Sequence, residues 1–157
     1  MKKLKPNYFI IPLVTILVAL FGNYFTAQGV NGWYDGLTKP EWTPSGAFIG
    51  AMWTFLYVLV TAIVLRFWNK FKGTNNFRLI IGLFIANAVL NATWSTVFFG
   101  FNLIGFGLAH IILLNLTIVS LIVLIWPKSK MLSIGLLPYT GWVTVATALN
   151  YFIWTLN

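Results

Sequence analysis

Long stretches without Lys, Arg, Asp or Glu dominate the pattern of polar and apolar positions; they cover Tyr8 to Ala27, Ala47 to Leu65, Leu79 to Trp126, and Met131 to the C-terminus. A helix rising about 1.5 Å per residue needs about 20 apolar residues to cross a hydrocarbon core of about 30 Å. The third stretch is too long for one crossing, and Gly100 and Asn102 tolerate the left-handed backbone that ends a helix. The pattern therefore predicts five helices, over residues 8–27, 46–68, 78–100, 103–126 and 131–154.

These stretches do not fit a transmembrane β-barrel. Barrel strands alternate polar and apolar residues over about 10 positions, whereas a segment such as IILLNLTIVSLIVLIW does not alternate. The predicted fold is an all-α integral membrane protein, a bundle of five transmembrane helices in one domain over residues 1–157. Residues 28–45 are expected to form an external lid loop between the first two helices.

Composition and charge place the chain in a membrane and orient it. Of 157 residues, 59% are hydrophobic and 8% are charged, against about 25% charged residues in a soluble domain. All basic residues except Lys39 fall before the first helix or around the second and fourth connections. The positive-inside rule therefore predicts a cytoplasmic N-terminus and an outer C-terminus, in a bacterial inner membrane. The net charge of +8 then reflects topology and contact with anionic lipid heads, and no nucleic-acid partner is predicted.

Polar and aromatic residues inside the predicted helices mark the faces that point into the bundle. Asn87, Asn91 and Trp94 follow i, i+4, i+7 spacing on the third helix, and Trp53 and Tyr57 lie one turn apart on the second. The fifth helix carries a further stripe of Tyr139, Trp142, Ala146 and Asn150. Helix packing alone explains such stripes, but aromatic walls with a few amides also suit a large flat ligand.

The chain lacks the residues of conventional catalytic and metal sites. It has no cysteine, and its single histidine, His110, is expected to form an interhelix hydrogen bond rather than to bind a metal or haem. The uncharged stretches contain no group of the kind that couples transport to ions or protons. No metal site and no obligatory cofactor are predicted.

The segment WYDGLTKPEWTP, from Trp33 to Pro44, holds both acidic residues of the chain. Pro40 and Pro44 each fix their own φ and restrict the preceding residue, so the segment is expected to be a semi-rigid lid. Lys39 is a candidate partner for a ligand carboxylate.

Three motifs occur in the order and spacing of a known family. They read Trp33-Tyr34, Leu37, Lys39-Pro40, Trp42, Pro44, Trp53 and Leu56-Tyr57; Leu90-Asn91, Trp94 and Val97-Phe98-Phe99-Gly100; and Pro138-Tyr139, Trp142, Ala146-Thr147 and Leu149-Asn150-Tyr151. The set resembles the TspO/MBR family of translocator proteins. The chain departs from the family at Ser45, Ser95, Thr96 and His110, and no basic residue follows Tyr151, so the resemblance does not carry sterol binding over to this chain.

The resemblance implies a membrane receptor for porphyrins such as protoporphyrin IX and other flat apolar ligands, often a homodimer, linked to porphyrin transport or stress sensing. It implies a pocket under the first loop, and the lid is then expected to hold Trp33, Tyr34 and Trp42 over a floor of Trp53 and Trp142. Its expected ligand contacts are Tyr34, Trp42, Trp53, Tyr57, Asn87, Asn91, Trp94, His110, Tyr139, Trp142, Ala146 and Asn150.

Two alternatives stay open at this stage. The resemblance also implies light-dependent oxidative degradation of protoporphyrin IX, with Trp53 and Trp142 as the residues that carry it. The other alternative is a structural or partner-binding membrane protein. Small-residue pairs that permit close helix approach support it and offer homodimer faces: Gly82 with Ala86, and Gly105 with Ala109.

Overall fold

A computed structural model describes residues 5–157 as a bundle of helices. The helices are α1 (Asn7–Gly29), α2 (Gly46–Phe71), α3 (Phe77–Ser95), α4 (Ile104–Ile125), α5 (Lys130–Gly135) and α6 (Leu137–Leu156). Two π-helical turns, η1 (Val30–Tyr34) and η2 (Thr96–Gly100), continue α1 and α3. Within the described residues, 5 helices are long and apolar enough to cross a membrane, and no strand occurs. The predicted fold class is confirmed.

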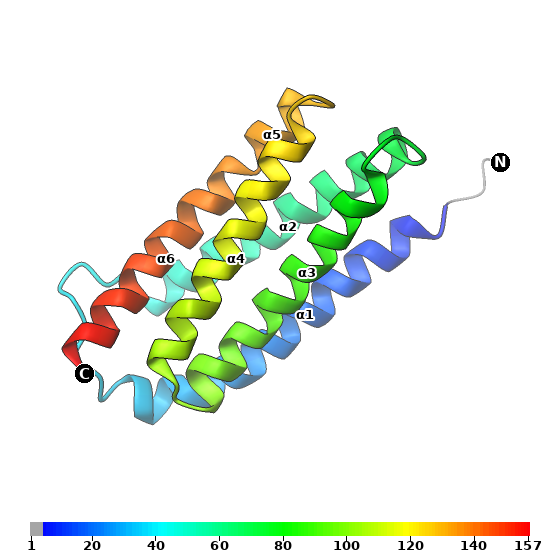
Figure 1. The fold of residues 1–157 in the computed structure, drawn as a ribbon. Coiled ribbons are helices and arrows are strands. Elements are labelled where there is room, and N and C mark those ends of the chain that lie inside the picture. Colours follow the sequence, from blue (N-terminus) through cyan, green and yellow to red (C-terminus); the bar gives the residue numbers. More distant parts are fainter. Residues whose placement is uncertain (1–4) are drawn as a thin grey trace.

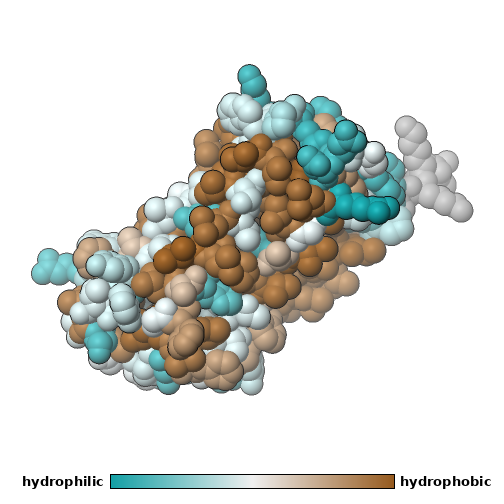
Figure 2. Space-filling model, in the orientation of Figure 1, coloured by the Kyte–Doolittle hydropathy of each residue, from teal (hydrophilic) through white to brown (hydrophobic). Residues whose placement is uncertain are grey.

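The five spans run up and down, so the two termini lie at opposite ends of the bundle (Figure 1). The described basic residues other than Lys39 lie toward the end where α1 begins, which we call the basic end. Figure 2 shows hydrophilic side chains gathered toward the two ends and a broad hydrophobic surface between them. Lys2 and Lys3 of the charge argument lie outside the described residues. The assignment of the basic end to the cytoplasm stays a prediction.

The first helix continues further than the pattern indicates. Residues 28 and 29 belong to α1, the turn η1 reaches Tyr34, and the outer loop therefore covers residues 35–45 instead of 28–45. Close packing explains the difference, because a Cβ on Gly29 would lie 2.8 Å from Cβ of Phe99. Gly29 is a contact glycine inside a helix, and the chain turns only at Gly32, whose φ of 148° favours glycine.

The fifth span, predicted as one helix over residues 131–154, is broken at Leu136. Pro138 has no amide hydrogen to donate one turn back, which favours a new helix start at this point. Ser129 caps α5 by accepting from the amide of Leu132 at 3.4 Å, and Ser133 Oγ donates to the carbonyl of Ile122 at 3.1 Å. The short helix α5 is thereby fixed to the end of α4.

The core lies where α4 packs between α3 and α6. The buried residues of α4 recur every three or four positions and form one face: Gly107, Ile111, Leu114, Ile118, Leu121 and Ile125. In contrast, only 6% of the apolar window of α1 is buried, against 39% for the α5–α6 span. The first helix lies at the edge of the bundle (Figure 1) and has the smallest buried share of the five spans.

Candidate functional site

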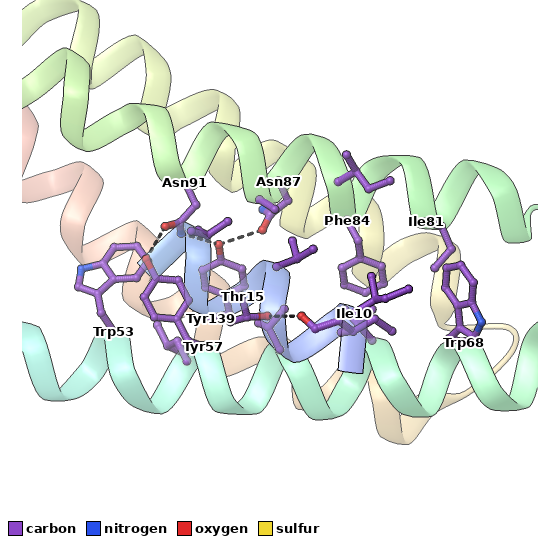
Figure 3. Close-up of a pocket in the computed structure, with 18 residues that line it drawn as sticks. Ile10, Thr15, Trp53, Tyr57, Trp68, Ile81, Phe84, Asn87, Asn91 and Tyr139 are labelled. Atoms are coloured by element: carbon purple, nitrogen blue, oxygen red, sulfur yellow. Dashed lines mark hydrogen bonds between the residues drawn. The ribbon is translucent and has the colours of Figure 1, made fainter. Parts of the chain in front are cut away.

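A cavity of about 320 Å³ lies between α1, α2 and α3. Figure 3 shows its length, with Trp53 and Tyr57 at one end, Trp68 at the other and Phe84 between them. Apolar side chains of α1 close one side: Ile10, Ile11, Val14 and Val18. Its volume is at the lower end of the range of about 300–1,000 Å³ found for small-molecule sites.

The cavity opens sideways along the helices. Three of its lining residues are exposed, namely Ile10 at 57%, Val14 at 46% and Ile85 at 61%. These residues lie within the apolar spans, so the opening faces the region that lipid chains would occupy. A ligand dissolved in the hydrocarbon would reach this cavity without crossing water.

One end of the cavity has an aromatic wall. The rings of Trp53 and Tyr57 lie 6.0 Å apart, with an angle of 32° between their planes. The two residues are one turn apart on α2, so their side chains emerge on the same face of the helix. The wall offers flat apolar surface to a planar ligand.

A chain of hydrogen bonds crosses the bundle beside this wall (Figure 3). The Tyr57 hydroxyl donates to Asn91 Oδ1 at 2.7 Å, and Asn91 Nδ2 donates to the Tyr139 hydroxyl at 3.0 Å. The Tyr139 hydroxyl donates to Asn87 Oδ1 at 3.0 Å, and Asn87 Nδ2 donates to Thr117 Oγ1 at 2.8 Å. Each of the four links joins two different helices. We call this set of five residues the polar chain.

The polar chain explains why amides occur in an apolar helix. Asn87 and Asn91 lie one turn apart on α3 and are buried at 4% and 7% exposure, where an unpaired amide is costly. Each asparagine uses both its oxygen and its nitrogen in the chain. Interhelix hydrogen bonds in membranes contribute about 0.6 kcal/mol each, so the chain adds both stability and a fixed register between α2, α3, α4 and α6.

The first helix has few polar links to the rest of the bundle. Within the described residues it has two side-chain hydrogen bonds to other helices: Thr61 Oγ1 lies 2.8 Å from Thr15 Oγ1, and Thr26 Oγ1 lies 3.4 Å from Ser95 Oγ. Thr15 also lines the cavity. The wall formed by α1 is therefore held beside the cavity by one polar link, from Thr61 to Thr15.

Comparisons with known proteins match almost the whole chain. Residues 10–155 match the family model described as TspO/MBR family. The chain is 38% identical over 145 residues to the tryptophan-rich protein TspO of Archaeoglobus fulgidus, covering 92% of this chain and 93% of that protein. It is 31% identical over 150 residues to protein CrtK of Rhodobacter capsulatus, covering 89% and 94% of the two. It is 29% identical over 146 residues to the human translocator protein, covering 90% and 86%.

The chain belongs to the TspO/MBR family. The resemblance seen in the three motifs is thereby confirmed, and with it an integral membrane protein of this family. Part of the site expected from TspO/MBR proteins comes together in the cavity, where the lining includes Trp53, Tyr57, Asn87, Asn91 and Tyr139. The other expected contacts do not line this cavity, and their role in ligand binding stays a prediction.

Two of these other TspO/MBR site residues join α3 to α4. Trp94 Nε1 donates to the carbonyl of Gly107 at 3.2 Å. His110 Nε2 lies 3.0 Å from the carbonyl of Leu90, which can only accept, so this nitrogen carries the hydrogen. His110 thus forms a hydrogen bond between two helices. Residues 5–157 contain no group of three His, Cys, Asp or Glu side chains that could hold a metal ion.

Trp142, Ala146 and Asn150 lie on α6. The Trp142 ring meets Phe48 edge to face at 5.8 Å, and its buried Nε1 has no partner within the described residues. Asn150 donates to the carbonyl of Ala146 at 3.0 Å, while its buried Oδ1 has no donor there. One hydrogen-bond donor, Trp142 Nε1, and one acceptor, Asn150 Oδ1, are therefore buried without a partner in this conformation.

The lid rings lie on the outer ends of the helices. Trp33 meets Phe98 at 5.5 Å, Tyr34 meets Phe99 at 5.5 Å and Trp42 meets Phe152 at 5.8 Å, all edge to face. None of these residues, nor Pro40 or Pro44, lines the cavity. The expected arrangement of three rings above a shared floor of Trp53 and Trp142 therefore does not belong to this cavity, and it stays a prediction.

Lys39 holds the outer loop together from inside. Its Nζ donates to the carbonyls of Tyr34 at 2.7 Å, Leu37 at 3.1 Å and Asp35 at 3.3 Å, and lies 4.7 Å above the Tyr34 ring. Asn157 adds a second link, since its side chain accepts from the Thr38 amide and donates to the Thr38 carbonyl, both at 3.0 Å. The ammonium of Lys39 is thus engaged with backbone and is not directed at the cavity, in contrast to its expected role toward a ligand carboxylate.

Several cavity residues have no counterpart in the sequence prediction. Trp68 has the position of an interfacial indole, and Ile10, Val14 and Ile85 have the apolar character of lipid-facing residues. Among these residues only Thr15 could have been recognised from the sequence, because it places a hydroxyl within the apolar first helix. Its hydrogen bond to Thr61 indicates that this face of α1 points toward α2.

Proposed function

We propose that this protein is a membrane receptor that binds porphyrins such as protoporphyrin IX, and other flat apolar ligands, in the cavity between α1, α2 and α3. The observation that carries the proposal is the pairing of an apolar cavity with the Trp53–Tyr57 wall and the polar chain at one end. The rings supply non-directional burial of a planar face, and the amides and hydroxyls supply a few hydrogen bonds for its polar edge. Membership of the TspO/MBR family supports the same ligand class.

The proposal includes a route into the site. The volume of about 320 Å³ is small for a porphyrin, so binding requires the cavity to widen. The α1 wall has the smallest buried share of the five spans, and two of the three exposed lining residues, Ile10 and Val14, belong to it. Ligands therefore arrive from the hydrocarbon, between helices, and displace α1 as they bind.

The experiment is a titration of the purified full chain with protoporphyrin IX, following tryptophan fluorescence in the dark. Saturable quenching is expected in the wild type, with weaker binding after Trp53→Phe and little change after Trp126→Phe. Trp126 is a matched control because it is exposed and does not line the cavity. Quenching that never saturates would contradict a binding site, and an equal effect of both substitutions would place the site elsewhere.

Cellular setting and oligomeric state belong to the same proposal. We place the protein in a bacterial inner membrane with the basic end in the cytoplasm, following the charge asymmetry. A homodimer through α3 is favoured over one through α4. A Cβ on Gly82 would meet nothing within 4 Å, whereas a Cβ on Gly105 would lie 3.1 Å from Nε1 of Trp154 within the same chain. The Gly82–Ala86 pair is therefore still available for close approach by a second helix.

A further inference from the structure

A second groove lies at the basic end of the bundle and has no part in porphyrin binding. It is lined by Tyr8 of α1 and by Ala62, Leu65, Arg66, Asn69 and Lys70 of α2. The porphyrin cavity takes positions 53, 56, 57, 60, 64 and 68 of the same helix. At 100° per residue these two sets fall on opposite faces of α2. The groove is therefore a separate feature on the outer side of the α1–α2 pair.

Two cations share this groove without an acid to balance them. Arg66 and Lys70 lie one turn apart, so their side chains are neighbours on the helix surface, and both residues are exposed. The two acidic side chains of the chain, Asp35 and Glu41, belong to the outer loop at the other end of the bundle. Like charges at this spacing repel each other. An anion bound between them would relieve this repulsion, and the one other partner of these charges among the described residues is the Phe71 ring, 5.4 Å from Lys70 Nζ.

The groove also has an apolar part, and its depth matches the edge of a membrane. Ala62 and Leu65 lie on the side of the cations toward the middle of α2. Since α2 ends at Phe71, Arg66 lies about 8 Å along the axis from the end of the helix. A long basic side chain at this depth can place its charge among lipid head groups while its stem stays in contact with apolar surface.

We propose that this groove binds one anionic phospholipid, whose phosphodiester is held by Arg66 and Lys70 and whose acyl chain begins along Ala62 and Leu65. The planar guanidinium of Arg66 can contact two phosphate oxygens at once, and the ammonium of Lys70 provides a second charge. The Tyr8 hydroxyl provides a neutral donor from α1. The lipid would then join α1 to α2 at the basic end. An inorganic phosphate ion shares the anionic head but has nothing to place on the apolar part.

Native mass spectrometry of the detergent-purified full chain tests this proposal. The probes are phosphatidylglycerol, phosphatidylcholine with the same acyl chains, and inorganic phosphate. The double variant Arg66→Gln/Lys70→Gln is compared with Lys72→Gln/Arg78→Gln, which removes the same charge at the same end from residues that do not line the groove. Far-UV circular dichroism and the tryptophan emission of each variant establish that it is folded.

The wild type is expected to retain one phosphatidylglycerol more strongly than phosphatidylcholine. The groove variant should bind phosphatidylglycerol at least about tenfold more weakly, because each of the two cations contributes severalfold near an anionic head group. The control variant should bind it as the wild type does. Equal losses in both variants would show a general charge effect and overturn the proposal. Displacement of the lipid by millimolar inorganic phosphate would overturn the lipid as occupant. Porphyrin binding is expected to persist in the groove variant, so the two proposals fail separately.

Discussion

Asn91 on α3 donates to the hydroxyl of Tyr139 on α6 at 3.0 Å, in the middle of a membrane-spanning bundle. Both residues are buried, and both also line the proposed ligand cavity. A single contact therefore belongs to the framework of the protein and to its site. Substitutions in the polar chain should affect folding and binding together.

Tyr139→Phe tests the framework role. It removes the hydroxyl that connects Asn91 with Asn87 and leaves an amide nitrogen and an amide oxygen unpaired in the core. We expect the free energy of unfolding to fall by about 1–3 kcal/mol, measured by thermal or denaturant unfolding in detergent. Tyr24→Phe is the matched control, because Tyr24 is 62% exposed on α1. Equal stability of the two variants would contradict the chain as a stabilising element.

A bulky residue at the side opening tests the route of the ligand. Val14→Trp fills the opening and should slow protoporphyrin IX association severalfold, while Ile16→Trp should leave the rate unchanged. Ile16 is 54% exposed on the same helix but does not line the cavity. Stopped-flow fluorescence in nanodiscs gives both rates.

The same measurement on Pro40→Ala/Pro44→Ala separates this route from gating by the outer loop. The loop rings contact Phe98, Phe99 and Phe152 rather than the cavity, so loosening the loop should not change the association or dissociation rate. Faster association in the proline variant, with no effect of Val14→Trp, would mean that the ligand passes beneath the loop.

The two family tryptophans can be distinguished under illumination. Trp53 lines the cavity and Trp142 does not. If dioxygen oxidises a bound porphyrin in light with the help of the protein, the indole beside the pigment is the group that can donate electrons or intercept radicals, so Trp53→Phe should slow the bleaching of the porphyrin absorption band more than Trp142→Phe does. Loss of the band at the wild-type rate in both variants would leave binding as the only supported role. A larger effect of Trp142→Phe would place the pigment beneath the outer loop.

Gly29→Ala tests the close approach of α1 to η2. The added Cβ would lie 2.8 Å from a side-chain carbon and 3.0 Å from the carbonyl oxygen of Phe99. We expect a loss of about 1–3 kcal/mol in the free energy of unfolding. Gly50→Ala, with nothing within 4 Å of its Cβ, should instead be neutral or stabilise α2 by up to about 1 kcal/mol. A neutral Gly29→Ala would show that the two segments can separate at little cost.

The sequence predicts best where periodicity fixes a face. Asn87 and Asn91 on α3, with Trp53 and Tyr57 on α2, lie on the expected inner faces, because residues one turn apart must share a side of the helix. The wall formed by α1 could not be predicted, since Ile10 and Val14 have the same chemistry as residues that face lipid. The outer loop was misplaced for another reason: proline restricts the backbone locally, but the rings that Trp33 and Trp42 contact depend on where η2 and α6 end in space.

The break before Pro138 and the helical Gly29 illustrate the same limit. A proline near the start of a span permits either a kink or a new helix, and only the bond from Ser133 to α4 selects the second. A glycine after an apolar run is typical of a helix end, and only the neighbouring Phe99 shows that it serves packing. In both cases the deciding partner is more than ten positions away in the sequence.

The polar chain also has a direction. The donors follow one order, from Tyr57 on α2 to Thr117 on α4, and the Tyr57 hydroxyl oxygen accepts no hydrogen bond from residues 5–157. The Tyr57 hydroxyl can therefore accept a hydrogen bond from a ligand, whereas its own hydrogen is already donated to Asn91. This polarity should determine which flat ligands bind best. A ligand that places a hydroxyl, a protonated carboxyl or a ring N–H beside Tyr57 can donate a hydrogen bond to its oxygen. A methylated analogue of similar shape has no hydrogen to donate and should bind more weakly.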